Sequence, residues 1–235
     1  YWGALENGKP PRAAYVMGCD VAAGSQDAAG RGASNSCLSI ANEATGQKAA
    51  ELALSGVWPR DFAKLAVAVA RWFHEARMAW ESGGPGREFG ATVLEADYRN
   101  VYWRQTNEQS LSRAPTEIPG WAATRESKDA LLGAYRGALH EGKFKNPSVI
   151  SLRECAYYVY SPAQGAFHGR ALNTEDPTGA RANHGDRVIA DALCWMLVSK
   201  RRGPVLESEE PALIVNSWAW RQAQAVRGEE EKFEW

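Results

Sequence analysis

One segment in the first half of the chain limits the fold more than any other. Residues 59–75 carry apolar side chains at three-to-four spacing and begin with a proline, so they are predicted to form an amphipathic helix. Residues 77–81 (RMAWE) follow almost at once and form a short apolar run of strand length. A strand reached through a helix is typical of a parallel crossover, so the chain is expected to build an α/β sheet.

Three strand-like segments precede this helix. Residues 13–20 (AAYVMGCD) form a short apolar run that stops at Asp20, as a buried strand would. Residues 36–42 and 48–55 follow a loop rich in Gly, Ser and Ala, and the sequence between them contains a glycine suited to a hairpin turn. The sheet is therefore expected to begin with three strands, of which the second and third are antiparallel.

The rest of the chain continues to alternate between apolar patterns typical of helices and those typical of strands. The predicted elements are helices at 87–97, 128–141 (with its start signal at 124–127), 147–157 and 184–200, a strand at 101–104, a loop at 105–124, and a hairpin of 158–161 with 166–172. This order matches a ribonuclease H-like α/β domain, although other mixed α/β folds could give the same order. We predict a mixed sheet flanked by helices, with an added hairpin and a C-terminal tail. The predicted divisions are an extended segment at 1–12, the domain at 13–203, and an acidic tail at 204–235 that is helical or flexible.

Composition favours a folded domain and argues against several classes of protein. Apolar residues make up 45 % of the 235 residues, enough for a packed core. No apolar run approaches the roughly 20 residues that span a bilayer, and the first residues lack the pattern of a signal peptide. The cysteines are scattered without a CxxC pair, which favours reduced thiols in a cytosolic compartment and argues against structural zinc. They are Cys19, Cys37, Cys155 and Cys194.

The charge distribution gives a weak indication of a phosphate-bearing partner. The whole chain has a net charge of −1. The segment 204–235 holds seven acidic and three basic residues, which leaves the rest of the chain at about +3. A mildly basic body could accept a phosphate backbone locally.

Three carboxylates are predicted to lie at the ends of elements. Asp20 ends the first strand, Glu81 ends the strand after the crossover helix, and Asp186 lies in the first turn of the last predicted helix. Side chains at such ends can converge at one edge of a sheet, and clustered carboxylates repel one another unless they hold a cation. Two Mg²⁺ or Mn²⁺ ions about 4 Å apart supply what phosphodiester hydrolysis needs, an activated water and a neutralised leaving oxygen.

Each of these residues also has an ordinary structural explanation. Asp20 could cap a turn, and the helix dipole would favour Asp186 whatever its function. Glu81 precedes the turn-forming sequence SGGPG and could simply be solvated. Taken one at a time, none of the three identifies a metal site.

Three short segments occur in an order and at a spacing that a known family shares. They are GCDVAAG at 18–24, WESGGPG at 80–86 and NHGDRVIADAL at 183–193, and YRNVYWRQ at 98–105 adds to them. Together they resemble the C-terminal nuclease domain of the large terminase subunit of tailed bacteriophages, over roughly residues 13–200. The resemblance implies a ribonuclease H-like fold. It also implies a metal-dependent DNA endonuclease that cuts concatemeric viral DNA during genome packaging, in the host cytoplasm.

The resemblance implies particular site residues. Carried onto matching positions, it makes Asp20, Glu81 and Asp186 the ligands of two divalent ions, Mg²⁺ or Mn²⁺, with Asp20 bridging both. Many family members have two consecutive aspartates after the histidine, where this chain has His184-Gly185-Asp186. Since Gly185 cannot bind a metal, either Asp186 serves alone or His184 or Asp27 completes the second site. The glycines after Glu81 are expected to allow a sharp turn and a close backbone approach to metal or phosphate.

The implied partner is double-stranded DNA. Contacts to its backbone would be independent of sequence and sensitive to salt, and the candidates for them are Lys128, His168, Arg170 and Arg181. Within a full terminase the further partners would be the ATPase domain, the small terminase subunit and the portal, with no membrane. The ATPase motif GxxxxGK[ST] does not occur in the sequence, so we expect an isolated nuclease domain or a truncated chain.

Three other interpretations remain open. Another ribonuclease H-like enzyme, such as a Holliday-junction resolvase or a transposase-type nuclease, would prefer branched or end-specific DNA. A carboxylate-pair hydrolase acting on sugars would need no divalent metal. A non-catalytic packaging assembly module would depend on the aromatic residues of the tail, which are Trp218, Trp220, Phe233 and Trp235.

Overall fold

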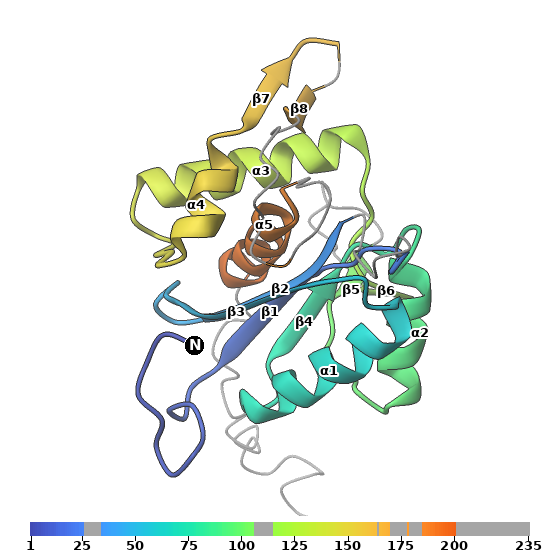
Figure 1. The fold of residues 1–235 in the computed structure, drawn as a ribbon, viewed down its shortest axis with the longest axis vertical. Helices are drawn as coiled ribbons and strands as arrows, with labels where there is room; N and C mark the ends of the chain where they lie inside the picture. The colour runs from blue at the N-terminus through green and yellow to red at the C-terminus, as the bar shows by residue number, and fades with distance from the viewer. Residues whose placement is uncertain (26–33, 106–114, 164, 170–177, 179–184, 201–235) are drawn as a thin grey trace, which may run out of the picture. The chain divides into compact units, whose positions relative to one another are not determined.

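A four-stranded mixed sheet lies at the centre of the domain (Figure 1). The structure is a computed structural model that describes residues 1–25, 34–105, 115–163, 165–169, 178 and 185–200. The strand order is β3-β2-β1-β4, with β1 antiparallel to β2 and parallel to β4, which confirms the predicted crossover. The strands are β1 (Tyr15–Asp20), β2 (Asn35–Asn42), β3 (Lys48–Ser55) and β4 (Arg77–Trp80).

Helices cover both faces of this sheet (Figure 1). Helices α1 (Pro59–Trp72) and α2 (Gly86–Glu95) lie on one face, and α5 (Asp186–Ser199) lies on the other. Helices α3 (Arg125–His140) and α4 (Val149–Cys155) pack against the outer side of α5. Two small hairpins complete the described elements, β5 (Trp103–Gln105) with β6 (Pro115–Pro119) and β7 (Tyr158–Ser161) with β8 (Gly165–His168). The predicted mixed sheet flanked by helices with an added hairpin is confirmed.

The alternation of side chains along β1 decides which residues face α5. Met17 and Cys19 belong to the core under α1 and α2, whereas Val16 belongs to the core under α5. Gly18 also faces α5, because a Cβ built there would lie 2.1 Å from the carbonyl oxygen of Ala190. Only a glycine at position 18 lets the helix pack this closely. Asp20 follows the same parity and therefore lies on the α5 side of the sheet.

Several helix bounds differ from the predictions for local reasons. Helix α1 ends at Trp72, three residues early, because His74 and Glu75 take positive φ angles of 55° and 61°. Helix α3 begins at Arg125, within the predicted helix start at 124–127, where Thr124 and Ser127 form a capping box. Helix α5 begins at Asp186 because Gly185 has a φ of 77°, outside the helical region. Helix α2 starts and ends one to two residues before its predicted bounds, as is common at helix ends.

The prediction of a loop over 105–124 was wrong for part of that range. Residues 115–119 form strand β6, which pairs with β5 from Trp103 opposite Pro119 to Gln105 opposite Pro115. The two prolines conceal this strand in the sequence, because proline lacks the backbone donor of a ladder and is tolerated only at sheet edges. Residues 106–114 lie outside the described part of the chain, as does the predicted tail 204–235. No helix in the described residues is long and apolar enough to cross a membrane.

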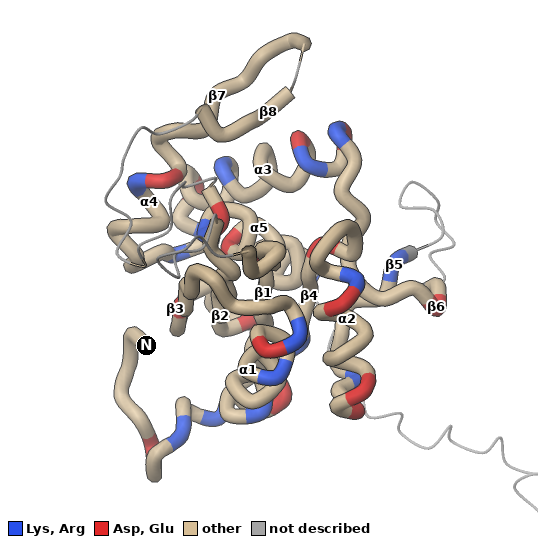
Figure 2. The backbone as a smooth tube through the Cα atoms, turned by 45° about the vertical axis from the view of Figure 1, so that its right-hand side comes forward, with Lys and Arg blue, Asp and Glu red and all other residues tan. Residues whose placement is uncertain are grey.

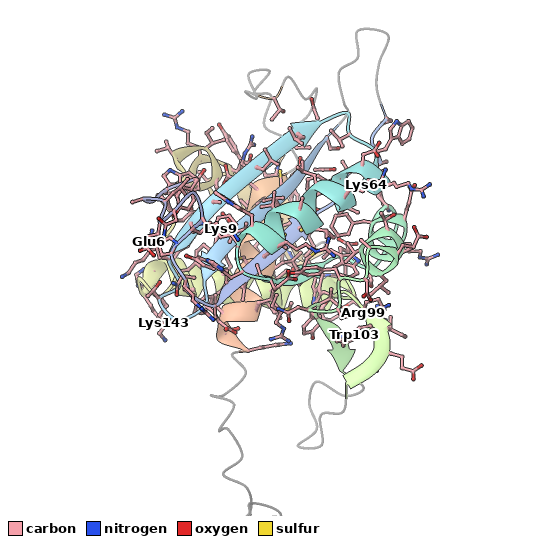
Figure 3. All side chains as sticks on the ribbon, turned by 90° about the horizontal axis from the view of Figure 1, so that it is seen from below. Glu6, Lys9, Lys64, Arg99, Trp103 and Lys143 are labelled. Atoms are coloured by element: carbon pink, nitrogen blue, oxygen red, sulfur yellow. The ribbon has the colours of Figure 1, made fainter. Side chains whose placement is uncertain are left out.

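Buried ion pairs attach α5 to the elements around it. Lys48 on β3 is fully buried and places its Nζ atom 2.7 Å from Asp191 Oδ1 on α5. Arg187, also on α5, pairs with Glu154 on α4, and both side chains are buried. The exposed pairs differ, since Lys64, Arg99 and Lys143 lie on the outside (Figure 3) and pair with acids close by in sequence. Exposed pairs contribute little to stability, whereas a buried charge depends on its partner.

Candidate metal centre

The three predicted carboxylates come together at one end of the sheet. The parallel register between β1 and β4 pairs Cys19 with Trp80, and the next residues along these strands are Asp20 and Glu81. Both side chains follow the parity that faces α5. Asp186 is the first residue of α5 and is buried, at 6 % exposure. Three segments that are distant in sequence therefore bring one carboxylate each to the same place.

The carboxylates of Asp186 and Glu81 are near enough to Asp20 to affect its pKa. Asp20 is half-buried, and burial is the largest cause that raises its pKa well above the ordinary value. The negative charges of Asp186 and then Glu81 raise this pKa further. The ammonium group of Lys128, at the start of α3, acts in the opposite direction. Lys128 therefore lies close enough to act on Asp20, and its predicted contact with DNA stays a prediction.

Asp186 is held by a contact that sequence reasoning missed. Its Oδ2 atom accepts a hydrogen bond of 3.0 Å from the backbone N–H of Asn35, at the start of β2. The next residue, Arg187, donates its backbone N–H to Glu154 Oε2 at 3.1 Å. Because Gly185 has no side chain to cap α5, the carboxylate of Glu154 on another helix satisfies one of the free N–H groups there. No sequence pattern links these residues, since more than 30 positions separate each pair.

The sequence after Glu81 forms a tight turn, as predicted. The backbone N–H of Ser82 donates to the carbonyl of Trp121 at 2.8 Å, and Glu81 forms a parallel bridge with Trp121. A Cβ at Gly86 would lie 1.7 Å from the carbonyl oxygen of Glu81, so only glycine can begin α2 there. Gly84 takes a φ of 47°. The glycines therefore bring the start of α2 against the glutamate backbone, and their approach to a metal or phosphate stays a prediction.

Tyr158 is a second neighbour of the cluster that the sequence did not indicate. Its hydroxyl donates to the carbonyl of Gly185 at 3.2 Å, beside Asp186. Burial raises the pKa of Tyr158, and the charges of Asp20 and Asp186 raise it further, so the phenol keeps its proton at neutral pH. In the sequence, the glycine at position 185 could have indicated such a neighbour, because a missing side chain leaves space that another residue can fill.

The chemistry of the cluster fits a divalent cation. Carboxylate oxygens are the ligands that Mg²⁺ and Mn²⁺ prefer, and a cation would relieve the repulsion that raises the pKa of Asp20. Among the described residues, no group of three or more His, Cys, Asp or Glu side chains is arranged so that it could hold an ion as it stands. His184 and Asp27, the two predicted additional ligands, lie outside the described residues.

The predicted DNA contacts are only partly within the described chain. His168 lies on β8, with its ring 5.3 Å from the ring of Tyr158. Arg170 and Arg181 lie outside the described residues. Basic and acidic residues are interspersed along α1 and α3 (Figure 2). The role of these residues in binding DNA stays a prediction.

The sheet order and the helices on both faces define a ribonuclease H-like α/β fold. The same fold occurs in solved structures of phage nucleases. The large terminase nuclease of thermophilic phage G20c is 16 % identical, with a TM-score of 0.55 over 80 % of this chain and 84 % of that one. Its form with bound magnesium is 18 % identical, with a TM-score of 0.55 over 80 % and 83 %. The large terminase nuclease domain of Thermus phage P74-26 is 16 % identical, with a TM-score of 0.51 over 80 % of each chain.

The likeness to these solved structures is one of fold, because the sequence identity is only 16 % to 18 %. No protein-family model matches the chain, and no curated protein matches it. The G20c nuclease has also been solved with bound cobalt and with bound zinc. The chain therefore has the fold of the large terminase nucleases, as the resemblance of its short segments implied.

Proposed function

We propose that this domain is a divalent-metal-dependent DNA endonuclease whose ligands are Asp20, Glu81 and Asp186. The observation that carries the proposal is the gathering of these carboxylates from β1, the end of β4 and the start of α5, with a pKa of Asp20 raised by burial and by the other two. Clustered carboxylates repel one another, and a bound cation would compensate this repulsion, so such a cluster is a candidate metal site. The bound magnesium, cobalt and zinc of the G20c nuclease support a divalent ion.

The biological setting that we propose is genome packaging by a tailed phage. The likeness to large terminase nucleases supports cutting of concatemeric viral DNA. In that setting the domain works in the host cytoplasm with an ATPase domain, the small terminase subunit and the portal. The physiological ion in this proposal is Mg²⁺ or Mn²⁺, both of which suit a set of carboxylate ligands.

The residues have distinct proposed roles. Asp20 would hold both divalent ions, while Glu81 and Asp186 would each help to hold one of them. When bound, divalent ions activate water and neutralise charge on the leaving oxygen of a phosphodiester. Asn35 holds one oxygen of Asp186 and so limits how its carboxylate can turn. Lys128 supplies a positive charge beside Asp20 that is suited to a DNA phosphate.

Cleavage of supercoiled plasmid tests this proposal. We expect nicked and linear products in Mg²⁺ or Mn²⁺, and a rate at least about 10³-fold lower in excess EDTA, because the ions supply several kcal/mol of transition-state stabilisation. Glu95→Gln is a matched control, since Glu95 is an exposed carboxylate on α2 whose removal should leave the rate unchanged. Cleavage that persists in EDTA, or no cleavage with either ion, would contradict the proposal. Preferential cutting of four-way junctions would reassign the substrate to that of a resolvase.

A further inference from the structure

The start of α5 has a space where most residues would carry a side chain. Gly185 is the N-cap of this helix, and its φ of 77° lies in the left-handed region. A Cβ built on it would lie 2.5 Å from two atoms of Tyr158, the ring carbon Cε2 and the hydroxyl oxygen. Real Cβ atoms essentially never come this close to another heavy atom. The ring of Tyr158 therefore occupies the space of a residue-185 side chain.

Tyr158 also makes a polar contact at this point. Its hydroxyl donates to the carbonyl oxygen of Gly185 at 3.2 Å. The same oxygen accepts the backbone N–H groups of Val188 at 3.0 Å and Ile189 at 3.1 Å, which are the first hydrogen bonds of α5. The phenol thus contacts the group from which the helix starts.

The tyrosine is itself fixed by the β7–β8 hairpin. It stands opposite His168 in the antiparallel register, and their rings meet edge to face at 5.3 Å. Strand β8 is attached to α3, because the backbone N–H of Ala166 donates to Asp129 Oδ1 at 2.7 Å. Because these contacts hold the ring of Tyr158 in place, its hydroxyl can in turn hold the start of α5.

Asp186 is the residue next to this contact. Its carboxylate receives the N–H of Asn35 on one side, and Glu154 receives the N–H of Arg187 on the other. Tyr158 completes the set by holding the carbonyl of Gly185. The backbone on both sides of Asp186 is therefore fixed by groups from the hairpin and from α4.

We propose that Tyr158 is a positioning residue of the metal centre. It fills the space beside Gly185 and fixes the first turn of α5, so that Asp186 presents its carboxylate to the same site as Asp20. The inference rests on the proposed function, in which Asp186 is a metal ligand. The β7–β8 hairpin thereby contributes to metal binding through Tyr158, although no residue of the hairpin is itself a proposed ligand.

The test is the Mn²⁺ affinity of Tyr158→Phe, measured by calorimetric titration of the folded protein. This variant keeps the ring that fills the space and removes only the hydroxyl, so the domain is expected to fold. We expect affinity to fall about 10-fold, at the lower end of the effect of removing groups that orient metal ligands. Tyr160→Phe is the matched control, because Tyr160 lies on the same strand, is 72 % exposed, and should leave affinity unchanged. Wild-type affinity in Tyr158→Phe would overturn the inference.

Two further titrations separate this inference from the proposed function. Wild-type protein should bind Mn²⁺, and Asp20→Asn should bind it at least about 100-fold more weakly, because it removes a ligand and not an orienting group. If the wild type binds no Mn²⁺, or if Asp20→Asn binds as well as the wild type, the proposed function fails. If those two results are as expected and Tyr158→Phe binds like the wild type, only the role of Tyr158 fails.

Discussion

Asp20→Asn is expected to abolish metal-dependent DNA nicking and to stabilise the metal-free protein at the same time. The rate should fall by at least about 10³-fold, because an amide oxygen cannot replace the charge of the carboxylate proposed to contact both ions. The free energy of unfolding without metal should rise by about 0.5–2 kcal/mol, the range that a single stabilising substitution commonly yields. For a chain of this length, that corresponds to roughly 2–4 °C in melting temperature per kcal/mol.

The stabilisation follows from the direction of the pKa shift. Burial and the charges of Asp186 and Glu81 raise the folded-state pKa of Asp20 above the value in the unfolded chain. Below the unfolded pKa the carboxyl group is protonated in both states and does not destabilise the fold. Stability is lost as the pH rises from the unfolded pKa through the folded pKa, and the loss is complete above the folded pKa. Asparagine carries no charge, so the gain over wild type should appear near neutral pH and vanish in acid.

Two results together would contradict this account of Asp20. They are an unchanged rate of nicking in Asp20→Asn and a metal-free melting temperature at pH 7.5 that does not rise. Glu95→Gln, the exposed control on α2, should alter neither quantity. Melting curves recorded at several pH values in EDTA, beside plasmid nicking in Mn²⁺, measure both.

Lys48→Met is expected to be the most destabilising substitution of a single charge in the described core. Burial alone would lower the pKa of Lys48, but Asp191 and Glu51 outweigh it and raise the pKa, so the ammonium stays charged. Removing it leaves the carboxylate of Asp191 buried on α5 with only neutral donors in contact, among them Asn146 at 2.8 Å. Breaking a buried pair in this way costs about 3–5 kcal/mol, which chemical denaturation at pH 7.5 would measure.

A matched lysine on the surface provides the control. Lys64 lies on the outside of the domain (Figure 3). It pairs with Asp61 on α1 at 3.1 Å, but both side chains are more than 60 % exposed. Lys64→Met should therefore change the free energy of unfolding by less than about 1 kcal/mol. Adding Asp191→Leu to Lys48→Met should recover part of the loss, because it removes the unpaired charge. Equal effects of Lys48→Met and Lys64→Met would show that the buried pair does not hold α5 to the sheet.

Much of the fold could be predicted because its elements have clear periods. The helix at 59–75 and the run RMAWE indicated a parallel crossover, and the parallel pairing of β1 with β4 confirms it. The predictions were wrong where one or two residues determine whether an element forms or where it begins. Two prolines concealed β6, and the left-handed Gly185 moved the start of the last helix. Such details depend on individual φ angles and hydrogen bonds, which a pattern of apolar residues does not contain.

The candidate site could likewise be predicted only in part. Asp20, Glu81 and Asp186 could be chosen because each ends an element, and the ends of adjacent parallel strands meet at one edge of a sheet. The groups that hold them could not be chosen. Asn35 reaches Asp186 across 151 positions, and Tyr158 reaches Gly185 across 27, through contacts that only the packed structure creates. These supporting residues carry no signature of their own in the sequence.

A crystal of the protein soaked in Mn²⁺ tests the central claim most directly, because anomalous scattering locates the ions without reference to activity. Our account predicts Mn²⁺ density bounded by the carboxylates of Asp20, Glu81 and Asp186, and none there in a crystal of Asp20→Asn. Mn²⁺ density elsewhere on the domain, in a protein that nicks plasmid and with these three side chains unliganded, would contradict it.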